Sequence, residues 1–248
     1  MDYTKLRDTL IKYADRYENS DFIIGDPSWF MHQVTGDSNQ ETMAFLASAL
    51  SYGSRKQFMP KIQSILDFSQ GEVTQWVVDG TYQKIFSYND TGCFYRLYDM
   101  RDMRMFLDSL RALLNENGSI GCFIRRVGAD NGYAAVDAIC RWFATHGFVS
   151  VVPKDTTSAC KRICMFLRWM VRDHSPVDLG LWADFIDKRT LIMPLDTHVL
   201  TQACELGLMH SRCASMSAAR KLTEKLAQVF PDDPLKGDFA LFGYGVTH

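Results

Sequence analysis

Hydrophobic positions recur at helical spacing along most of the chain, whereas strand patterns are rare. Near the N-terminus, Leu10, Tyr13 and Tyr17 fall on one face of a predicted helix, and Asp26-Pro27 interrupts the pattern. Short β-branched runs occur, for example at 149–152, but hairpin dipeptides do not separate alternating segments. The pattern therefore predicts an all-α fold. Further helices are expected at 38–51, 56–68, 72–79, 101–115, 119–126, 133–146, 158–172, 178–186, 196–206, 215–230 and 236–243.

The segment from Thr42 to Leu50 is apolar or small on every side. In a soluble protein, such a helix is expected at the centre of a bundle. Ser38-Asn39-Gln40-Glu41 precedes it and has the form of a capping box, in which Ser38 and Glu41 would each bond a backbone N–H. Gly53 follows it and suits a helix C-terminus. These residues predict a buried central helix that ends in a tight turn.

The composition is typical of a compact globular protein. The 248 residues include 16 Phe, 10 Tyr and 5 Trp, and the formal net charge is −2. Disordered chains, in contrast, are poor in aromatic residues and strongly charged. The length suits one large domain or two small lobes that share a cleft. Because positive and negative charges nearly balance, any binding of nucleic acid must come from a local cationic patch.

Signals for membranes, metals and disulfides are lacking in the sequence. No apolar run approaches the roughly 20 residues of a membrane span. The first residues also lack the apolar stretch of a signal peptide, so we expect a cytoplasmic protein. The seven cysteines form no CxxC pair, and the histidines show no HxxxH or HxH spacing. We expect reduced thiols and no metal site.

The helix predicted at 158–172 carries a stripe of cations. At about 100° per residue, Lys161, Arg168 and Arg172 lie within roughly 20° of one direction, and the opposite side is apolar. The helix supplies no acidic partners at i,i+4 spacing, and the flanks of the stripe, which include Trp169, are large and apolar. The stripe is therefore either a solvated outer face or part of a functional surface.

Lys161 lies in the first turn of this predicted helix. The helix dipole disfavours a cation there and so favours the neutral amine, which is a nucleophile. Thr156, Thr157 or Ser158 is expected to cap the helix, and the N–H groups exposed at its start can bind a phosphate. The sequence thus suggests Lys161 as a nucleophile beside a candidate phosphate site.

A second candidate segment follows the apolar run from Leu191 to Leu195. Asp196 comes directly after it, where the N-cap of a helix is expected. This carboxylate is either a structural cap or a functional group at the mouth of a cleft. His198 follows in the same segment, but the sequence supplies no partners with which it could bind a metal.

These segments resemble a known superfamily. Pro194 to Val199, with Ala203, Leu206 and Gly207 after it, resembles the segment that carries the catalytic aspartate of the helix-hairpin-helix DNA glycosylases, which include endonuclease III and 8-oxoguanine glycosylase. The segment from Phe45 to Arg55 resembles their buried helix and the turn whose side chains enter DNA. Lys161 matches the lysine nucleophile of the bifunctional members. The resemblance covers about 40–200. It implies a two-lobed helical bundle with a central cleft, the lobes lying at approximately 30–150 and at 151–248 with the N-terminal helix.

A closer similarity, over about 20–246, is to a bacterial family of unknown function that is usually placed near that superfamily. It rests on Cys160-Lys161-Arg162, on 165–172, on Pro194-Leu195-Asp196-Thr197-His198 and on Asp238 to Gly245. The chain departs from the glycosylases in two respects. The stretch from Thr156 to Cys160 lacks the hairpin's glycines, and the residues after 200 lack the four cysteine ligands of an iron–sulfur cluster. Neither such a cluster nor another cofactor is expected.

The resemblance implies that the protein excises a damaged or oxidised purine from double-stranded DNA. Asp196 would stabilise the positive charge that develops at C1′, or would activate the attacking amine. With Lys161 as the nucleophile, a Schiff base forms and β-elimination cleaves the strand. The expected DNA-binding residues are Tyr52, Arg55, Ser158, Arg168, Trp169, Arg172 and His198.

Alternatives remain open for these residues and for the whole chain. Arg168 and Arg172 could form buried ion pairs with Glu41 or Asp178, Arg55 could be an ordinary surface arginine, and Tyr52 could belong to the core. The chain could also be a non-catalytic relative that binds nucleic acid or a nucleobase ligand, or a helical interaction protein. The positions of the predicted lysine nucleophile and its aspartate distinguish these functions, because catalysis requires both side chains to face one solvent-connected site.

Overall fold

The computed structural model describes residues 3–211 and 213–247, and it is mostly helical, as predicted. The chain divides into two compact units. The first unit comprises the residues up to Gly25, Asp130–Val136 and the residues from Thr156 onward. The second comprises Asp26–Ala129 and Asp137–Asp155. Within the described residues, no helix combines the length and the apolar character that crossing a membrane requires.

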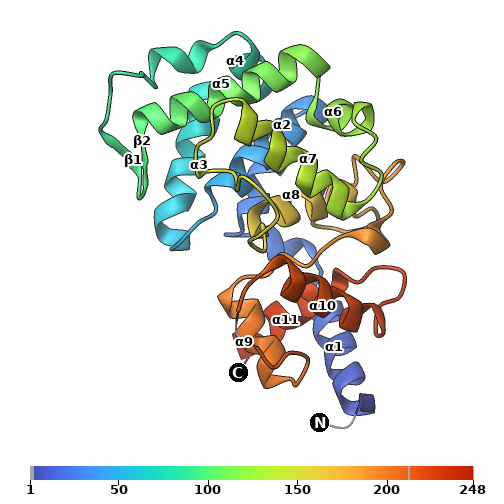
Figure 1. The fold of residues 1–248 in the computed structure, drawn as a ribbon. Coiled ribbons are helices and arrows are strands. Elements are labelled where there is room, and N and C mark those ends of the chain that lie inside the picture. The colour runs from blue at the N-terminus through green and yellow to red at the C-terminus, as the bar shows by residue number, and fades with distance from the viewer. Residues whose placement is uncertain (1–2, 212, 248) are drawn as a thin grey trace. The chain divides into compact units, whose positions relative to one another are not determined.

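The N-terminal helix of the first unit packs against its C-terminal helix. The elements of this unit are α1 (Tyr3–Tyr17), the 3₁₀ helix η1 (Ser20–Ile23), α8 (Lys161–Val171), η4 (Lys188–Thr190), α9 (Thr197–Glu205), α10 (Met216–Ala227) and α11 (Lys236–Thr247). Figure 1 shows α1 beside α11, and the rings of Tyr13 and Tyr244 meet edge to face at 5.9 Å. A Cβ at Gly243 would overlap the ring of Tyr17. The two helices approach closely because this position has no side chain.

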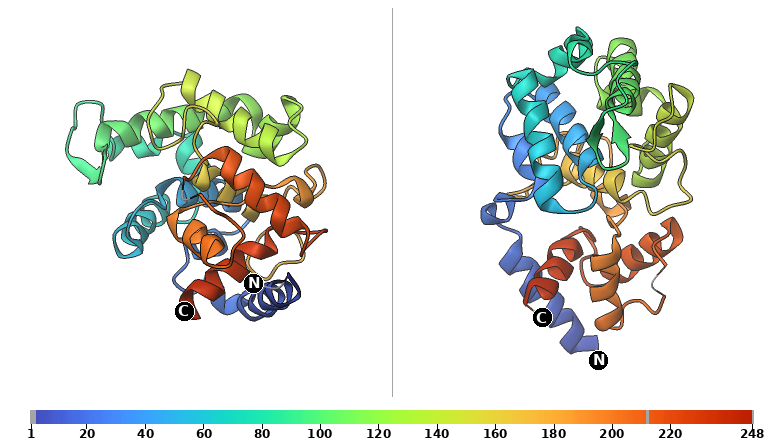
Figure 2. Two further views of the ribbon diagram at one scale, coloured as in Figure 1. Left: turned by 60° about the horizontal axis from the view of Figure 1, so that its bottom comes forward. Right: turned by 90° about the vertical axis from the view of Figure 1, so that its left-hand side faces the viewer.

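The second unit is built around α2. Its elements are η2 (Pro27–His32), α2 (Asp37–Leu50), α3 (Arg55–Ser69), α4 (Val73–Val78), η3 (Thr81–Lys84), the hairpin β1 (Cys93–Tyr95) and β2 (Tyr98–Asp99), α5 (Met100–Asn117) and α6 (Ile120–Arg126). Helix α7 (Gly132–Thr145) begins in the first unit and continues into the second. Helix α2 packs against η2, α3 and α4, as Figure 2 shows for α3. Every residue from Glu41 to Leu50 is buried, which confirms the predicted central helix.

The capping box predicted at Ser38 and Glu41 is wrong. Helix α2 begins at Asp37, and its N-cap makes no side-chain hydrogen bond. The buried carboxylate of Glu41 instead accepts hydrogen bonds from the backbone N–H groups of Ile120, at 2.7 Å, and Gly121, at 2.9 Å. These are the first residues of α6, where the helix dipole favours a negative charge. The residue therefore caps a helix, but one that lies far along the chain.

The helix predicted at 178–186 is also wrong, because this segment forms turns. The backbone N–H groups of Leu179 and Trp182 each donate, at 2.7 Å, to a carbonyl in the last turn of α8. Gly180 has a φ of 67°, which disfavours a helix, and a Cβ there would lie 2.9 Å from the Cα of Asp173. The apolar side chain of Trp182 is nevertheless buried. The segment satisfies the free carbonyls at the end of α8 instead of forming its own helix.

Candidate functional site

Lys161 is the first residue of α8. Cys160 is the N-cap, and its φ of 46° lies in the left-handed region that favours glycine. The residue thus adopts a backbone conformation that is more usual for glycine. The predicted side-chain cap is wrong, because α8 starts later than predicted and its N-cap makes no side-chain cap hydrogen bond. Ser158 is exposed and forms an isolated backbone bridge with Ser215.

Asp196 is the N-cap of α9, as predicted. Its Oδ1 accepts a hydrogen bond from the backbone N–H of Val199 at 2.9 Å. The residues from Leu191 to Leu195 are buried, and this buried run fixes the position of the cap. His198 is exposed in the first turn of α9. The second carboxylate oxygen, Oδ2, is left to interact with a side chain from elsewhere in the unit.

That side chain is Lys161. Its Nζ lies 3.2 Å from Oδ2 of Asp196, although the two residues are far apart in the sequence. The lysine and aspartate side chains are 34% and 30% exposed, so water or a small reactant can reach both. The start of α8 therefore supplies an amine, and the N-cap of α9 supplies a carboxylate, to the same partly exposed position.

Asp238, in the first turn of α11, is a third charged group near this pair. Its carboxylate forms an ion pair with the guanidinium of Arg168. Burial raises the pKa of Asp238 and Arg168 opposes this rise, while the charge of Asp196 raises the pKa further and that of Lys161 lowers it. Asp238 therefore lies close enough for its charge to act on the pair. The sequence reasoning gave it no role, although it begins the last of the segments similar to the bacterial family.

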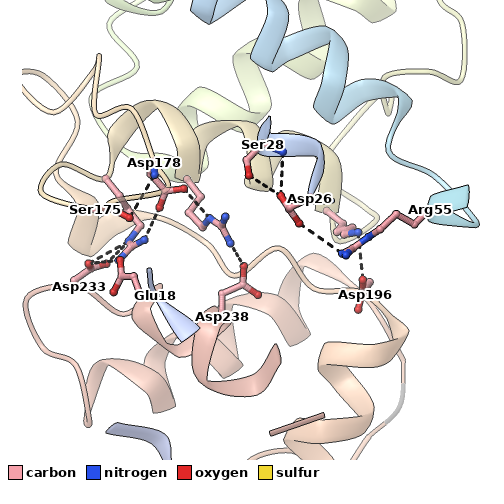
Figure 3. A network of polar contacts seen from close by, with 12 residues as sticks. Glu18, Asp26, Ser28, Arg55, Ser175, Asp178, Asp196, Asp233 and Asp238 are labelled. Atoms are coloured by element: carbon pink, nitrogen blue, oxygen red, sulfur yellow. Dashed lines mark hydrogen bonds and ion pairs between the residues drawn. The ribbon is translucent and has the colours of Figure 1, made fainter. Parts of the chain in front are cut away.

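Behind Asp238 lies a network of buried ion pairs. Arg172 is 1% exposed, and Figure 3 shows Glu18, Asp178 and Asp233 gathered together in this network. Arg172 donates to Asp233 at 2.7 Å and to Glu18 at 2.6 Å, and it also pairs with Asp178. Burial alone would lower the pKa of Arg172, but the three carboxylates raise it above its usual value. Asp178 also accepts from Arg168 at 3.3 Å.

These contacts correct the prediction that Arg168 and Arg172 bind DNA. Both guanidiniums are buried and paired with carboxylates, so they are not presented to a phosphate. The structure confirms the alternative of buried ion pairs with Asp178. The other partner considered, Glu41, accepts from the start of α6. Trp169 is fully buried, so the prediction that it contacts DNA is wrong as well.

Tyr52 and Arg55 belong to the second unit, where they flank the turn between α2 and α3. Both are exposed, and Arg55 lies 3.6 Å from the carboxylate of Asp26. Contacts of Tyr52, Arg55, Ser158 and His198 with DNA stay predictions. Among the described residues, no group of three or more His, Cys, Asp or Glu side chains could hold a metal ion.

The two oxygens of Asp196 have separable roles, and stability measurements can distinguish them. Asp196→Asn keeps an oxygen that can accept from the N–H of Val199, whereas Asp196→Ala removes the cap. Both variants lose the ion pair with Lys161. We therefore expect Asp196→Ala to be less stable than Asp196→Asn by about 1 kcal/mol, as measured by urea denaturation. Equal stabilities would show that the capping hydrogen bond from Val199 does not stabilise α9.

Fold and site together define a helical protein with a partly exposed lysine–aspartate pair next to a buried network of ion pairs. Residues 26–247 match the model of the family DUF2400, described as a protein of unknown function. The chain belongs to this family. No curated protein and no solved structure matches it. The relationship to the helix-hairpin-helix glycosylases stays a prediction.

Proposed function

We propose that this protein is a DNA glycosylase with lyase activity that removes a damaged or oxidised purine from double-stranded DNA. The observation that carries the proposal is the 3.2 Å contact between Nζ of Lys161 and Oδ2 of Asp196, both partly exposed. Base excision through a Schiff base needs an amine and a carboxylate at one position, and these two residues are also the ones that match the catalytic residues of the glycosylases.

In the proposed reaction, Lys161 first loses a proton to Oδ2 of Asp196, which lies 3.2 Å from its Nζ. The amine then forms a bond to C1′ as the glycosidic bond breaks, and the electron pair of that bond leaves with the base. The base takes up the proton that Asp196 received from Lys161, which restores the carboxylate. The nitrogen then transfers a proton to O4′ as the C1′–O4′ bond breaks, so that the sugar ring opens and a protonated imine (iminium ion) forms. Loss of a proton from C2′ then expels the 3′ phosphate by β-elimination. The carboxylate stabilises the positive charge that develops at C1′.

The buried network has a supporting role in this proposal. Arg168 holds Asp238 close to the pair, and Arg172 binds carboxylates that lie outside the helices, such as Asp178. The two arginines thus fix the position of α8, from which Lys161 projects. Because their charges are already neutralised, phosphates must be bound by other residues.

Borohydride trapping tests the proposed nucleophile. Wild-type protein incubated with duplexes that contain an abasic site or an oxidised purine should yield a covalent protein–DNA adduct when borohydride reduces the iminium ion. Lys161→Ala should give no adduct. Asp196→Asn should slow its formation by about 10²-fold or more, because the charge is lost while the cap is kept. Lys221→Ala, which removes an exposed lysine from α10 of the same unit, is the matched control and should trap normally.

An adduct that persists in Lys161→Ala would exclude this lysine as the nucleophile. If wild-type protein gives neither an adduct nor base excision with any duplex, the enzyme proposal fails. Tight, salt-dependent binding of the same duplexes would then identify a non-catalytic nucleic-acid-binding relative.

A further inference from the structure

An exposed surface in the second unit combines cations with large apolar side chains. It is formed by the turn after α2 and by the hairpin of β1 and β2, and we call it the hairpin surface. Leu97 is 72% exposed at the hairpin tip, and Tyr52 is 40% exposed on the turn. Arg55 is 52% exposed and Arg96 is exposed as well. The residues of the hairpin surface are Tyr52, Arg55, Lys61, Arg96 and Leu97.

Two contacts hold the hairpin against the turn, and a glycine makes room for one of them. The hydroxyl of Tyr95 donates to the backbone carbonyl of Tyr52, and burial raises the pKa of Tyr95, which keeps this donor protonated. The guanidinium of Arg96 lies over the ring of Tyr52, 5.1 Å from its centroid. Gly53 leaves room for this guanidinium, since a Cβ there would lie 3.0 Å from Cζ of Arg96. Turn and hairpin therefore form one structural element.

The hairpin tip carries an arginine at a position where other residues are usual. Tyr95 pairs with Tyr98, so Arg96 and Leu97 form a two-residue loop. Arg96 has a φ of 52°, a conformation that such loops normally assign to glycine, asparagine or aspartate. An arginine in this conformation is strained, and residues held in this way are frequent at binding sites. The strained backbone places Arg96 against Tyr52 and leaves Leu97 exposed at the tip.

The charge on this surface favours an anionic partner. Lys61 adds a cation, with its Nζ 5.0 Å from the centroid of the Phe94 ring. The carboxylate next to Arg55 belongs to Asp26, whose side chain is only 13% exposed. Cations that bind phosphates, next to an aromatic ring and an aliphatic side chain, are the groups with which proteins hold and unstack DNA.

We propose that the hairpin surface binds double-stranded DNA at an unstacked nucleotide. Arg55 and Arg96 contact phosphates, and Leu97 inserts into the base stack as an apolar wedge. Only the identity of the ligand, double-stranded DNA, rests on the function proposed above. The proposal adds the hairpin to the turn already predicted to contact DNA, and it involves neither Lys161 nor Asp196.

The test is fluorescence anisotropy with two labelled duplexes, one intact and one containing a tetrahydrofuran abasic analogue, which cannot form a Schiff base. Arg96→Gly removes the guanidinium, and glycine adopts a φ of 52° without strain, so the hairpin should stay folded. We expect it to weaken binding of both duplexes about 10-fold and to reduce the salt slope by about 1. Leu97→Ala should lower the affinity for the abasic duplex about 5-fold and leave the affinity for the intact duplex unchanged. Arg126→Ala removes an exposed arginine of α6 and should bind like wild type.

The outcomes separate this proposal from the enzyme proposal. If wild type binds DNA and traps on abasic duplexes, but Arg96→Gly and Leu97→Ala bind as tightly as wild type, the hairpin surface is excluded while the glycosylase proposal stands. If wild type traps and Arg126→Ala weakens binding as much as Arg96→Gly, binding is diffuse and the proposal is again excluded. If wild type binds neither duplex at 50 mM salt but binds polyglutamate, the surface serves an acidic protein partner and both proposals fail.

Discussion

Arg172→Met is expected to lower the free energy of unfolding by about 3–5 kcal/mol at pH 7. Methionine approximates the length of arginine but removes a charge that Glu18, Asp178 and Asp233 surround. The three carboxylates would then be left buried, and of the two arginines only Arg168, which contacts Asp178, would still offset their mutual repulsion. Breaking a buried ion pair in this way costs far more than the pair itself contributes. Urea denaturation of wild type and variant measures the difference.

The matched control is Arg189→Met, in the same unit. Arg189 is exposed and pairs with the neighbouring Asp187, so its removal should leave the free energy of unfolding nearly unchanged. A similar small loss for Arg172→Met would show that the network does not stabilise the fold.

The stability difference between wild type and Arg172→Met should narrow as the pH falls from 7 to 5. Burial raises the pKa of Asp178 even in the wild type, and loss of Arg172 removes a charge that lowers it. A carboxyl with a raised pKa binds its proton more tightly in the folded than in the unfolded protein, so acid stabilises the folded variant relative to neutral pH. A difference that widens toward pH 5 would contradict this account.

The network also shows what the sequence can and cannot predict about a charged helix face. The spacing of Lys161, Arg168 and Arg172 predicts that they point in one direction, because helical geometry is local. Which side chains face these cations depends on the tertiary fold. The carboxylates that neutralise the arginines come from outside α8, as Glu18 and Asp233 illustrate. The absence of acidic partners at i,i+4 spacing therefore did not mean that the stripe was free to bind a ligand.

The candidate site was predictable in part. Asp196 follows a buried apolar run at a recognisable N-cap, and a family resemblance pointed to Lys161, so both residues could be selected from sequence. Asp238 could not, because its position near them depends on how α11 packs in the first unit. The hairpin at 93–99 was missed because Arg96-Leu97 is not a hairpin dipeptide. Glu41 was assigned to the wrong helix because its partners lie 79 and 80 residues away.

Gly180→Ala is expected to lower the free energy of unfolding by about 2–4 kcal/mol, because two costs combine at this position. One is the φ of 67°, which an L-residue with a Cβ adopts only under strain. The other is steric, since the added Cβ would lie 2.9 Å from the Cα of Asp173 and 3.2 Å from the carbonyl oxygen of Arg172. Both are backbone atoms, which cannot move away as a flexible side chain can.

Gly207→Ala separates the two costs. Gly207 has a φ of 75° in the same unit, but nothing lies within 4 Å of the position that a Cβ would occupy. Gly207→Ala should therefore lower the free energy of unfolding only by the cost of the backbone strain, about 1–2 kcal/mol. Urea denaturation of both variants tests the explanation for the missing helix at 178–186. If Gly180→Ala is no less stable than Gly207→Ala, close packing against the end of α8 is not what holds this segment in turns.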